Sequence, residues 1–237
     1  MPVSLKDQSI LVIGASSGIG RAAALMFAHE GARVTASARR RDRLEQLRVE
    51  SGGLISIHPA DAGDPDQMTA LAAAAATGPV DVLVYATGTN TPDRALTRLT
   101  DPIWHELIQV NLNGAWYITR ALLPAMRAAR RGHLIYVSSI SGRTPDVSGA
   151  AYQASKRGML GLAHAVRVEE KQNHIRTCVI CPGLVDTELM EKRLVKPSAE
   201  TLAQALKPED VAEAILFVAK LPERVVIPEM EVVPTTL

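Results

Sequence analysis

Two residues with complementary proton chemistry, Tyr152 and Lys156, lie four positions apart in the stretch Tyr-Gln-Ala-Ser-Lys. At this spacing two side chains are neighbours on one face of a helix. A phenol and an ammonium both titrate at about pH 10, and a fixed positive charge beside the phenol favours the phenolate. The pair is therefore a candidate general acid or base, in which the ammonium lowers the pKa of the phenol.

A hydroxyl side chain that could hold a reacting oxygen, Ser139, stands thirteen residues before Tyr152, just after the apolar run 134–137. Such a run is typical of a buried strand, which would deliver the hydroxyl to the rim of a sheet. Ser138 is a competing hydroxyl, but adjacent strand residues point to opposite faces. Taken alone, Tyr-x-x-x-Lys is also typical of a solvated helix surface, so its interpretation depends on the rest of the chain.

Short apolar runs alternate with helical patterns along the whole chain. We expect strands at 10–13, 33–38, 55–58, 80–85, 134–137 and 175–180, and helices at 21–30, 41–50, 67–76, 102–131, 152–172 and 208–220. Near-continuous apolar strands separated by helices are typical of a parallel sheet covered on both faces. The sequence thus predicts an α/β protein with a single doubly wound parallel sheet of the Rossmann type. Residues 1–237 would form one domain, with a possible edge strand at 230–233.

The composition favours one domain with a large core and a small-molecule partner. Of the 237 residues, 47% are hydrophobic, and the 26 basic and 25 acidic residues nearly cancel, which argues against a nucleic-acid-binding surface. The sequence has no apolar run of the ~20 residues that a membrane span requires. It also lacks a basic region followed by an apolar stretch near residue 1. We therefore expect a soluble, cytoplasmic protein that contacts neither nucleic acid nor membrane.

The two cysteines, Cys178 and Cys181, have the spacing of a redox or metal-binding pair. Both fall in the predicted strand 175–180 or directly after it, and residues three apart in a strand point to opposite faces. We therefore interpret both as small core residues and predict no metal site.

Three glycines, Gly14, Gly18 and Gly20, stand between the first predicted strand and the first predicted helix. Glycines at this place allow a tight turn and let backbone amides approach a pyrophosphate held at the helix amino terminus. An ordinary glycine-rich turn is the alternative. The order of strand, loop and helix favours a dinucleotide site.

Five motifs occur together along the chain: Gly14-x-x-x-Gly18-Ile19-Gly20, Asn111, Ser139, Tyr152-x-x-x-Lys156 and Pro182-Gly183. In their order and spacing the chain resembles the short-chain dehydrogenase/reductase family, from about residue 5 to residue 219. The resemblance implies an oxidoreductase that transfers a hydride between a nicotinamide cofactor and a secondary alcohol or carbonyl compound. It also implies a homodimer or homotetramer.

The resemblance also implies a role for each residue of the catalytic set. Tyr152 would exchange a proton with the substrate oxygen, while Lys156 would lower the phenol pKa and bind the nicotinamide ribose. Ser139 would hold the reacting oxygen, and Asn111 would bind a water that links Lys156 to solvent. Without the resemblance, Asn111 is more simply a polar residue that satisfies helix backbone.

The choice of cofactor depends on the end of the second predicted strand. An NAD site places a carboxylate there for the ribose hydroxyl, whereas this chain has Ala38 followed by Arg39 and Arg40. Guanidinium groups attract a 2′-phosphate, so NADP(H) is favoured over NAD(H); a solvated, charged helix start is the alternative. The resemblance implies further cofactor contacts from Ser16, Ser17, Ile19, Asp61 (at the adenine), Ala62, Ala86, Gly88, Pro182, Gly183, Val185 and Thr187 (at the carboxamide).

The chain departs from the family pattern after the fourth predicted strand, where Tyr85-Ala86-Thr87-Gly88 replaces the usual Asn-Asn-Ala-Gly. This change keeps open a catalytically idle NADP(H)-binding regulatory or scaffold protein. An epimerase or dehydratase on the same fold is disfavoured, because such relatives usually have longer chains.

Substrate specificity is expected in three irregular segments, 89–98, 142–149 and a probable substrate lid at about 189–206. The basic residues Arg143, Lys192, Arg193 and Lys196 could favour an acidic substrate, although solvated charge is the preferred interpretation of them.

Overall fold

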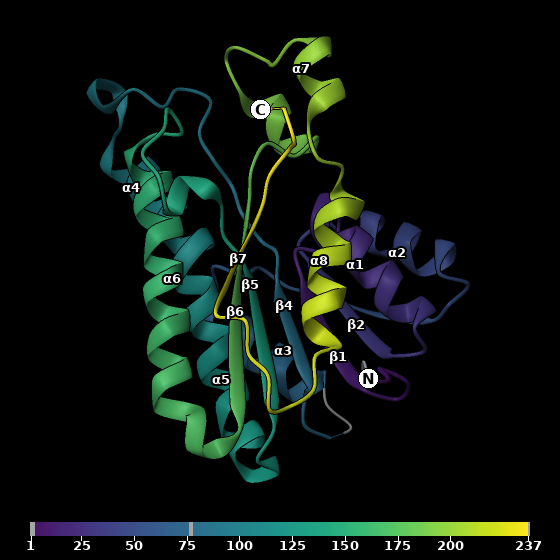
Figure 1. Cartoon of the computed structure of the whole chain (residues 1–237). Coiled ribbons are helices and arrows are strands. Elements are labelled where there is room, and N and C mark those ends of the chain that lie inside the picture. Colours follow the sequence, from purple (N-terminus) through teal and green to yellow (C-terminus); the bar gives the residue numbers. More distant parts are fainter. Residues whose placement is uncertain (1–2, 76–77, 237) are drawn as a thin grey trace.

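The computed structural model describes residues 3–75 and 78–236, and its central feature is one seven-stranded sheet in the order β3-β2-β1-β4-β5-β6-β7 (Figure 1). The strands are β1 (Ser9–Ile13), β2 (Arg33–Ala38), β3 (Ile55–Pro59), β4 (Val82–Tyr85), β5 (Gly132–Val137), β6 (Ile175–Pro182) and β7 (Glu229–Val232). Every neighbouring pair is parallel. The predicted doubly wound parallel sheet is confirmed, and the predicted edge strand is β7.

Helices cover both faces of the sheet (Figure 1). One face carries α1 (Gly18–His29), α2 (Arg41–Glu50) and α8 (Pro208–Ala219), and the other carries α3 (Pro65–Ala74), α5 (Gly114–Ala129) and α6 (Ala150–Glu170). Two separate apolar cores result, because alternate strand residues point to alternate faces. Cys178 lies in one core and Cys181 in the other, both as free buried thiols, as their spacing predicts.

The predicted long helix 102–131 is wrong in one respect, because a π-helical turn, Gln109–Asn113, separates α4 (Asp101–Ile108) from α5. Tyr85 at the end of β4 is fully buried, and its hydroxyl donates to the Val110 carbonyl within this turn at 2.6 Å. Apolar periodicity does not distinguish an α-helical turn from a π-helical one, so the sequence pattern gave no sign of the interruption. The predicted helix 67–76 corresponds to α3, and Ala76 lies outside the described residues.

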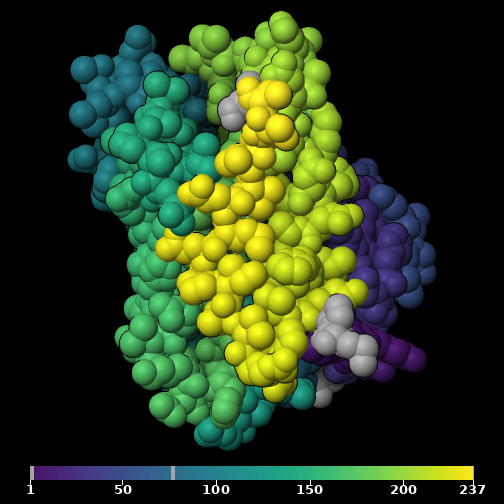
Figure 2. Space-filling view, viewed as in Figure 1, coloured from purple at the N-terminus to yellow at the C-terminus, as the bar shows by residue number. Residues whose placement is uncertain are grey.

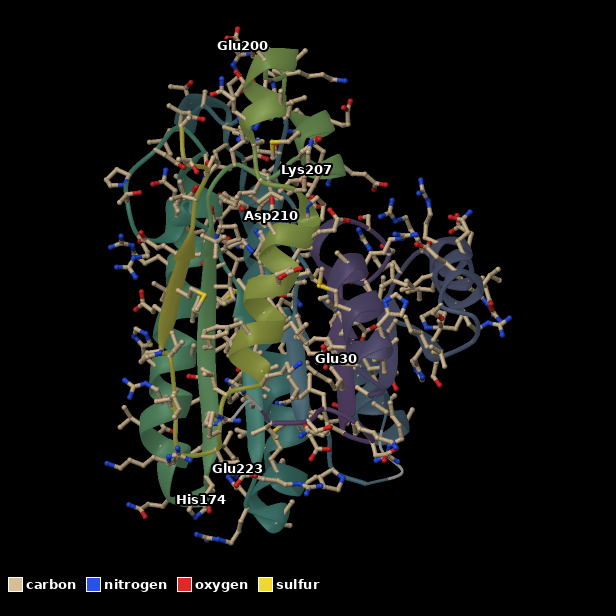
Figure 3. All side chains as sticks on the ribbon, turned by 45° about the vertical axis from the view of Figure 1, so that its right-hand side comes forward. Glu30, His174, Glu200, Lys207, Asp210 and Glu223 are labelled. Atoms are coloured by element: carbon tan, nitrogen blue, oxygen red, sulfur yellow. The ribbon has the colours of Figure 1, made fainter. Side chains whose placement is uncertain are left out.

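The site lies at the end of the sheet where α7 (Ala199–Gln204) is found. His174 precedes β6 and Glu200 lies on α7, at opposite ends of the molecule (Figure 3). The carboxyl ends of the strands therefore face α7. Because the chain reverses its strand order between β1 and β4, a crevice is expected at this end.

The last part of the chain forms the outer edge of the sheet next to β6. Figure 2 shows it in yellow, running along the molecule between α6 and α8. Its strand β7 pairs with β6 and is therefore the edge strand on that side. In 3–75 and 78–236, no helix has both the length and the apolar character that crossing a bilayer requires.

Candidate active site

A cleft of about 400 Å³ opens at the carboxyl ends of β1, β2 and β4. Most of the predicted cofactor residues line it, namely Gly14, Ser16, Ser17, Gly18, Ile19, Arg39, Arg40, Asp61, Ala62, Ala86, Gly88, Tyr152, Lys156 and Thr187. Pro182, Gly183 and Val185 instead line an adjoining cavity of about 280 Å³. The cleft also has walls that the sequence did not suggest, from Val110 and Glu188. Thr87 of the altered segment after β4 lines it too, as do Thr89, Leu189 and Lys192 of the segments that we expected to carry substrate specificity.

The glycine loop folds back tightly between β1 and α1. Gly14 has φ +89°, a left-handed conformation that glycine adopts without strain, and a Cβ on Gly20 would clash with the Gly14 carbonyl oxygen. Gly20 thus packs closely against Gly14 of the loop and does not line the cleft. At the start of α1, the Ser17 side chain makes no capping hydrogen bond. The first amides of this helix are therefore left for another acceptor, which suits a phosphate.

Arg40 connects the glycine loop with Glu188, which directly precedes the segment 189–206. Its Nη2 donates to the hydroxyl oxygens of Ser16 and Ser17 at 3.0 and 2.8 Å. Its Nη1 donates to Glu188, 148 residues further along, at 2.8 Å. This hydrogen bond is the main reason why the pKa of the Glu188 carboxyl is lowered. Sequence reasoning missed Glu188, because no motif links a lid residue to the end of β2.

Tyr152 and Lys156 share one face of α6 and both are buried. The Lys156 Nζ lies 5.7 Å from the centre of the Tyr152 ring and donates to the Val137 carbonyl at 2.9 Å. Burial lowers the pKa of Lys156 to about 8. The ammonium therefore remains mostly charged at neutral pH.

The expectation of a lowered phenol pKa is wrong in this structure. Burial raises the pKa of Tyr152, and this effect outweighs the lowering by a hydrogen bond with Ser139 and by the charges of Arg94 and Arg193. Burial disfavours the charged phenolate more strongly than its neighbours favour it. At neutral pH the side chain is a protonated phenol, which is the form that donates a proton.

The two competing serines have different partners. The Ser138 hydroxyl donates to the Lys156 carbonyl at 2.9 Å and so joins β5 to α6. The Ser139 hydroxyl donates to Ser141 at 3.1 Å, and it lies near enough to Tyr152 to lower the pKa of the phenol by accepting from it. The structure thus brings Ser139, and not Ser138, into contact with the phenol.

Asn111 is fully buried in the π-helical turn, where its side chain holds neighbouring elements together. Its Nδ2 donates to the Thr89 carbonyl and to the Ser155 hydroxyl, both at 3.0 Å. Its Oδ1 accepts from the Thr89 amide at 2.8 Å. These contacts fix the chain after β4 against α6, next to Lys156. The side chain therefore positions the cleft wall.

The adjoining cavity of about 280 Å³ begins at Tyr152 and Ser139. The three irregular segments expected to carry specificity supply part of its lining, including Asn90 and Arg94, Asp146 and Ser148, and Leu189, Met190 and Arg193. Segment 189–206 also contacts the segment after β4, because the Lys192 ammonium donates to the Thr89 hydroxyl at 2.6 Å. The 400 Å³ cleft and this cavity share Tyr152 and Leu189 in their lining, so they meet at Tyr152.

A dinucleotide-type glycine loop and a buried Tyr-Ser-Lys set on a doubly wound sheet define an oxidoreductase site. Residues 8–197 match the family model described as short chain dehydrogenase. The chain belongs to this family, whose members include oxidoreductases acting on alcohol and carbonyl groups.

Individual relatives and solved structures agree with this assignment. The 3-oxoacyl-(acyl-carrier-protein) reductase FabG of Thermotoga maritima is 34% identical over 226 residues, 91% of each chain. The closed form of a serine dehydrogenase complexed with NADP+ has a TM-score of 0.88 at 31% identity, covering 96% of this chain and 95% of its own. A metagenomic short-chain oxidoreductase in complex with NADP has a TM-score of 0.84 at 34% identity, covering 98% and 99%.

Proposed function

We propose that the protein is an NADP(H)-dependent oxidoreductase that interconverts a secondary alcohol and a carbonyl compound, with Tyr152 as general acid and base. One observation carries this proposal. Among the described residues, Tyr152 is the titratable side chain that borders both the 400 Å³ cleft and the 280 Å³ cavity. A proton carried there can reach a substrate placed between the two.

The residues around the phenol support proton transfer to a carbonyl oxygen. The nicotinamide, when bound, supplies the hydride. In reduction, Tyr152 donates its proton to the substrate oxygen, which the Ser139 hydroxyl also holds by a hydrogen bond. The ammonium of Lys156 favours the phenolate that remains and offers its other N–H groups to a ribose. Oxidation runs the same steps in reverse.

The 400 Å³ cleft suits a dinucleotide that carries an additional 2′-phosphate. The uncapped start of α1 suits the pyrophosphate. At the end of β2 the side chains of Arg39 and Arg40 border the cleft, and Arg40 already holds a carboxylate, that of Glu188. A guanidinium that binds an anion here favours a 2′-phosphate over a bare hydroxyl. Two similar solved structures contain NADP, which agrees with this preference.

The proposal includes self-association of the protein through the exposed sides of α4, α5 and α6. Trp104 on α4, Trp116 on α5 and Val168 on α6 leave 36%, 42% and 55% of their surface exposed. Large apolar side chains exposed on adjacent helices suit a second copy of the chain. Sedimentation of the purified protein tests this self-association. We expect a dimer or a tetramer, and a monomer would contradict the proposal.

An oxidation screen tests the proposed activity. NADPH and NADH are each offered with a panel of ketones, aldehydes and keto acids, and loss of the reduced nicotinamide is followed by absorbance. Turnover with NADPH, at a higher kcat/KM than with NADH, is expected. Tight NADPH binding without turnover on any compound would instead indicate the regulatory or scaffold protein.

A further inference from the structure

The cavity beyond Tyr152 holds two guanidinium groups. Arg94, from the segment after β4, and Arg193, from the lid, both line it, and both act electrostatically on Tyr152. They also act on each other: burial is the main reason why the pKa of Arg94 is lowered, and the charge of Arg193 lowers it further. Two like charges directed at one small space repel, and a bound anion would relieve that repulsion.

Neither guanidinium has a carboxylate partner within the described parts of the chain at ion-pair distance. Arg94 Nε donates only to a carbonyl oxygen, that of Thr91, at 3.3 Å. The Nε of Arg193 is buried without a hydrogen-bond partner in the part of the chain that the structure describes. A buried, unpaired donor is costly, which favours a ligand that accepts from it.

The acidic residue Asp146 also lines the cavity, and its charge acts on Arg94, but it forms an ion pair with neither arginine among the described residues. Asp146 accepts from the Ser148 amide at 2.8 Å and from the Ser148 hydroxyl at 3.0 Å. It also accepts from the Ser141 hydroxyl. The carboxylate is therefore held by its own loop, and its single charge offsets only part of the positive charge of the two arginines that line the cavity.

The remaining lining limits the size of what can bind. Ile19, Leu184, Leu189 and Met190 add apolar side chains, and the cavity measures about 280 Å³. That is the lower end of the range for small-molecule sites. A compact compound with one anionic group fits this space.

We propose that the substrate is a small hydroxy acid or oxo acid whose carboxylate is bound by Arg94 and Arg193. Planar guanidinium groups bind carboxylates through paired hydrogen bonds. The reacting oxygen then lies at Tyr152 and Ser139, at the mouth of the same cavity. This inference rests on the proposed oxidoreductase function and names its substrate class.

The test compares acids with their uncharged esters. Pyruvate, acetoacetate and levulinate place the carbonyl at increasing distances from the carboxylate, and their methyl esters remove the charge. With NADPH, we expect at least one acid to exceed its ester in kcat/KM by about tenfold or more, the effect of one charge-assisted hydrogen bond. Esters that react as well as the acids at all three spacings would overturn the proposal.

Two variants and a control localise the effect. Arg193→Gln and Arg94→Gln should each lower the acid-to-ester ratio by about tenfold, mainly through KM. Lys196→Gln is the matched control, since Lys196 lies on the same lid segment but pairs with Glu191 and lines neither cavity. An unchanged ratio in both arginine variants would contradict the assignment.

Calorimetry separates this proposal from the proposed function. Binding of D- and L-lactate and of 3-hydroxybutyrate is measured in the presence of NADP+, for the native protein and for Arg193→Gln. Arginine-dependent binding without any turnover would support the carboxylate site and contradict the oxidoreductase. If the protein reduces only neutral ketones and binds none of the acids, the result would support the oxidoreductase and overturn the carboxylate site. If the protein neither binds the acids nor turns over any compound, both proposals are overturned.

Discussion

Arg40 donates through Nη1 to Glu188 at 2.8 Å and thereby connects the glycine loop, through Ser16 and Ser17, with the residue directly before segment 189–206. Arg43 reaches the same carboxylate at 3.7 Å. The carboxylate of Glu188 thus occupies the guanidinium that we assign to a 2′-phosphate. Binding of NADP(H) would require the phosphate to compete with this carboxylate for Arg40.

Removing the charge of Glu188 should strengthen NADPH binding. We expect Glu188→Gln to lower the NADPH dissociation constant by about fivefold, and the NADH constant much less, because only NADPH carries the competing phosphate. Fluorescence titration of both nucleotides measures this. Glu191→Gln, at a lid carboxylate that pairs with Lys196, is the control. Equal changes for the two nucleotides would show that Glu188 does not compete with the phosphate.

Substitution of the two neighbouring serines should have different effects, one on catalysis and one on stability. Ser139→Ala removes the hydroxyl that hydrogen-bonds Tyr152 and should lower kcat by about a hundredfold. Ser138→Ala removes a hydrogen bond to the Lys156 carbonyl and should reduce the free energy of unfolding by about 1 kcal/mol. Steady-state kinetics and urea denaturation distinguish the two effects. A larger loss of kcat in Ser138→Ala would reverse the assignment.

The glycine loop should be intolerant of a methyl group at one position. Gly20→Ala places a Cβ against the Gly14 carbonyl oxygen and should weaken binding of both nucleotides by at least about tenfold. Gly161→Ala is the comparison, because its Cβ would meet no atom within 4 Å on α6. That variant should bind nucleotide normally and be more stable by about 0.5 to 1 kcal/mol. Unaltered binding by Gly20→Ala would show that the loop geometry is not needed.

Acid should destabilise the protein through His133 of β5. This side chain is 1% exposed, and both ring nitrogens lack hydrogen-bond partners among the described residues. Burial lowers its pKa from 6.5 to about 3, with a smaller contribution from the charge of Arg176. Between these two values the unfolded chain binds a proton that the folded chain does not. Stability is therefore complete above pH 6.5 and is lost as the pH falls towards about 3.

Replacing His133 should remove that part of the pH dependence. From pH 6.5 to about 4.5, we expect the native protein to lose about 2 to 3 kcal/mol more than His133→Leu. Urea denaturation at a series of pH values gives this difference directly. Parallel curves for the two proteins would mean that His133 does not titrate as its burial implies.

Much of the fold follows from sequence because each strand is an apolar run followed by a helical pattern. The boundary of β2 and the start of α2 were predicted to the residue, at Arg33–Ala38 and Arg41. The π-helical turn at Asn111 was not, because apolar periodicity does not distinguish it from an α-helical turn, and the Val110 carbonyl within it accepts from Tyr85 of another element. Local pattern cannot report a contact of that kind.

Residues of the candidate site were predictable from sequence where they lie close together in the chain as a short motif, as in the glycine loop and in Tyr-x-x-x-Lys. It was not predictable where the fold joins distant segments. Glu188 reaches Arg40 across 148 residues, and Arg94 reaches the cavity from a segment without a motif. The direction of the Tyr152 pKa was missed because the sequence shows the neighbouring charge but not the extent of burial.

The most direct test of the central claim is single-turnover reduction by Tyr152→Phe. Enzyme loaded with NADPH is mixed with the best carbonyl compound of the screen, and nucleotide oxidation is followed by stopped flow. The account predicts NADPH affinity close to that of the native protein and a hydride-transfer rate lower by about a thousandfold, since the proton donor is gone. An unchanged rate with NADPH still bound would contradict it.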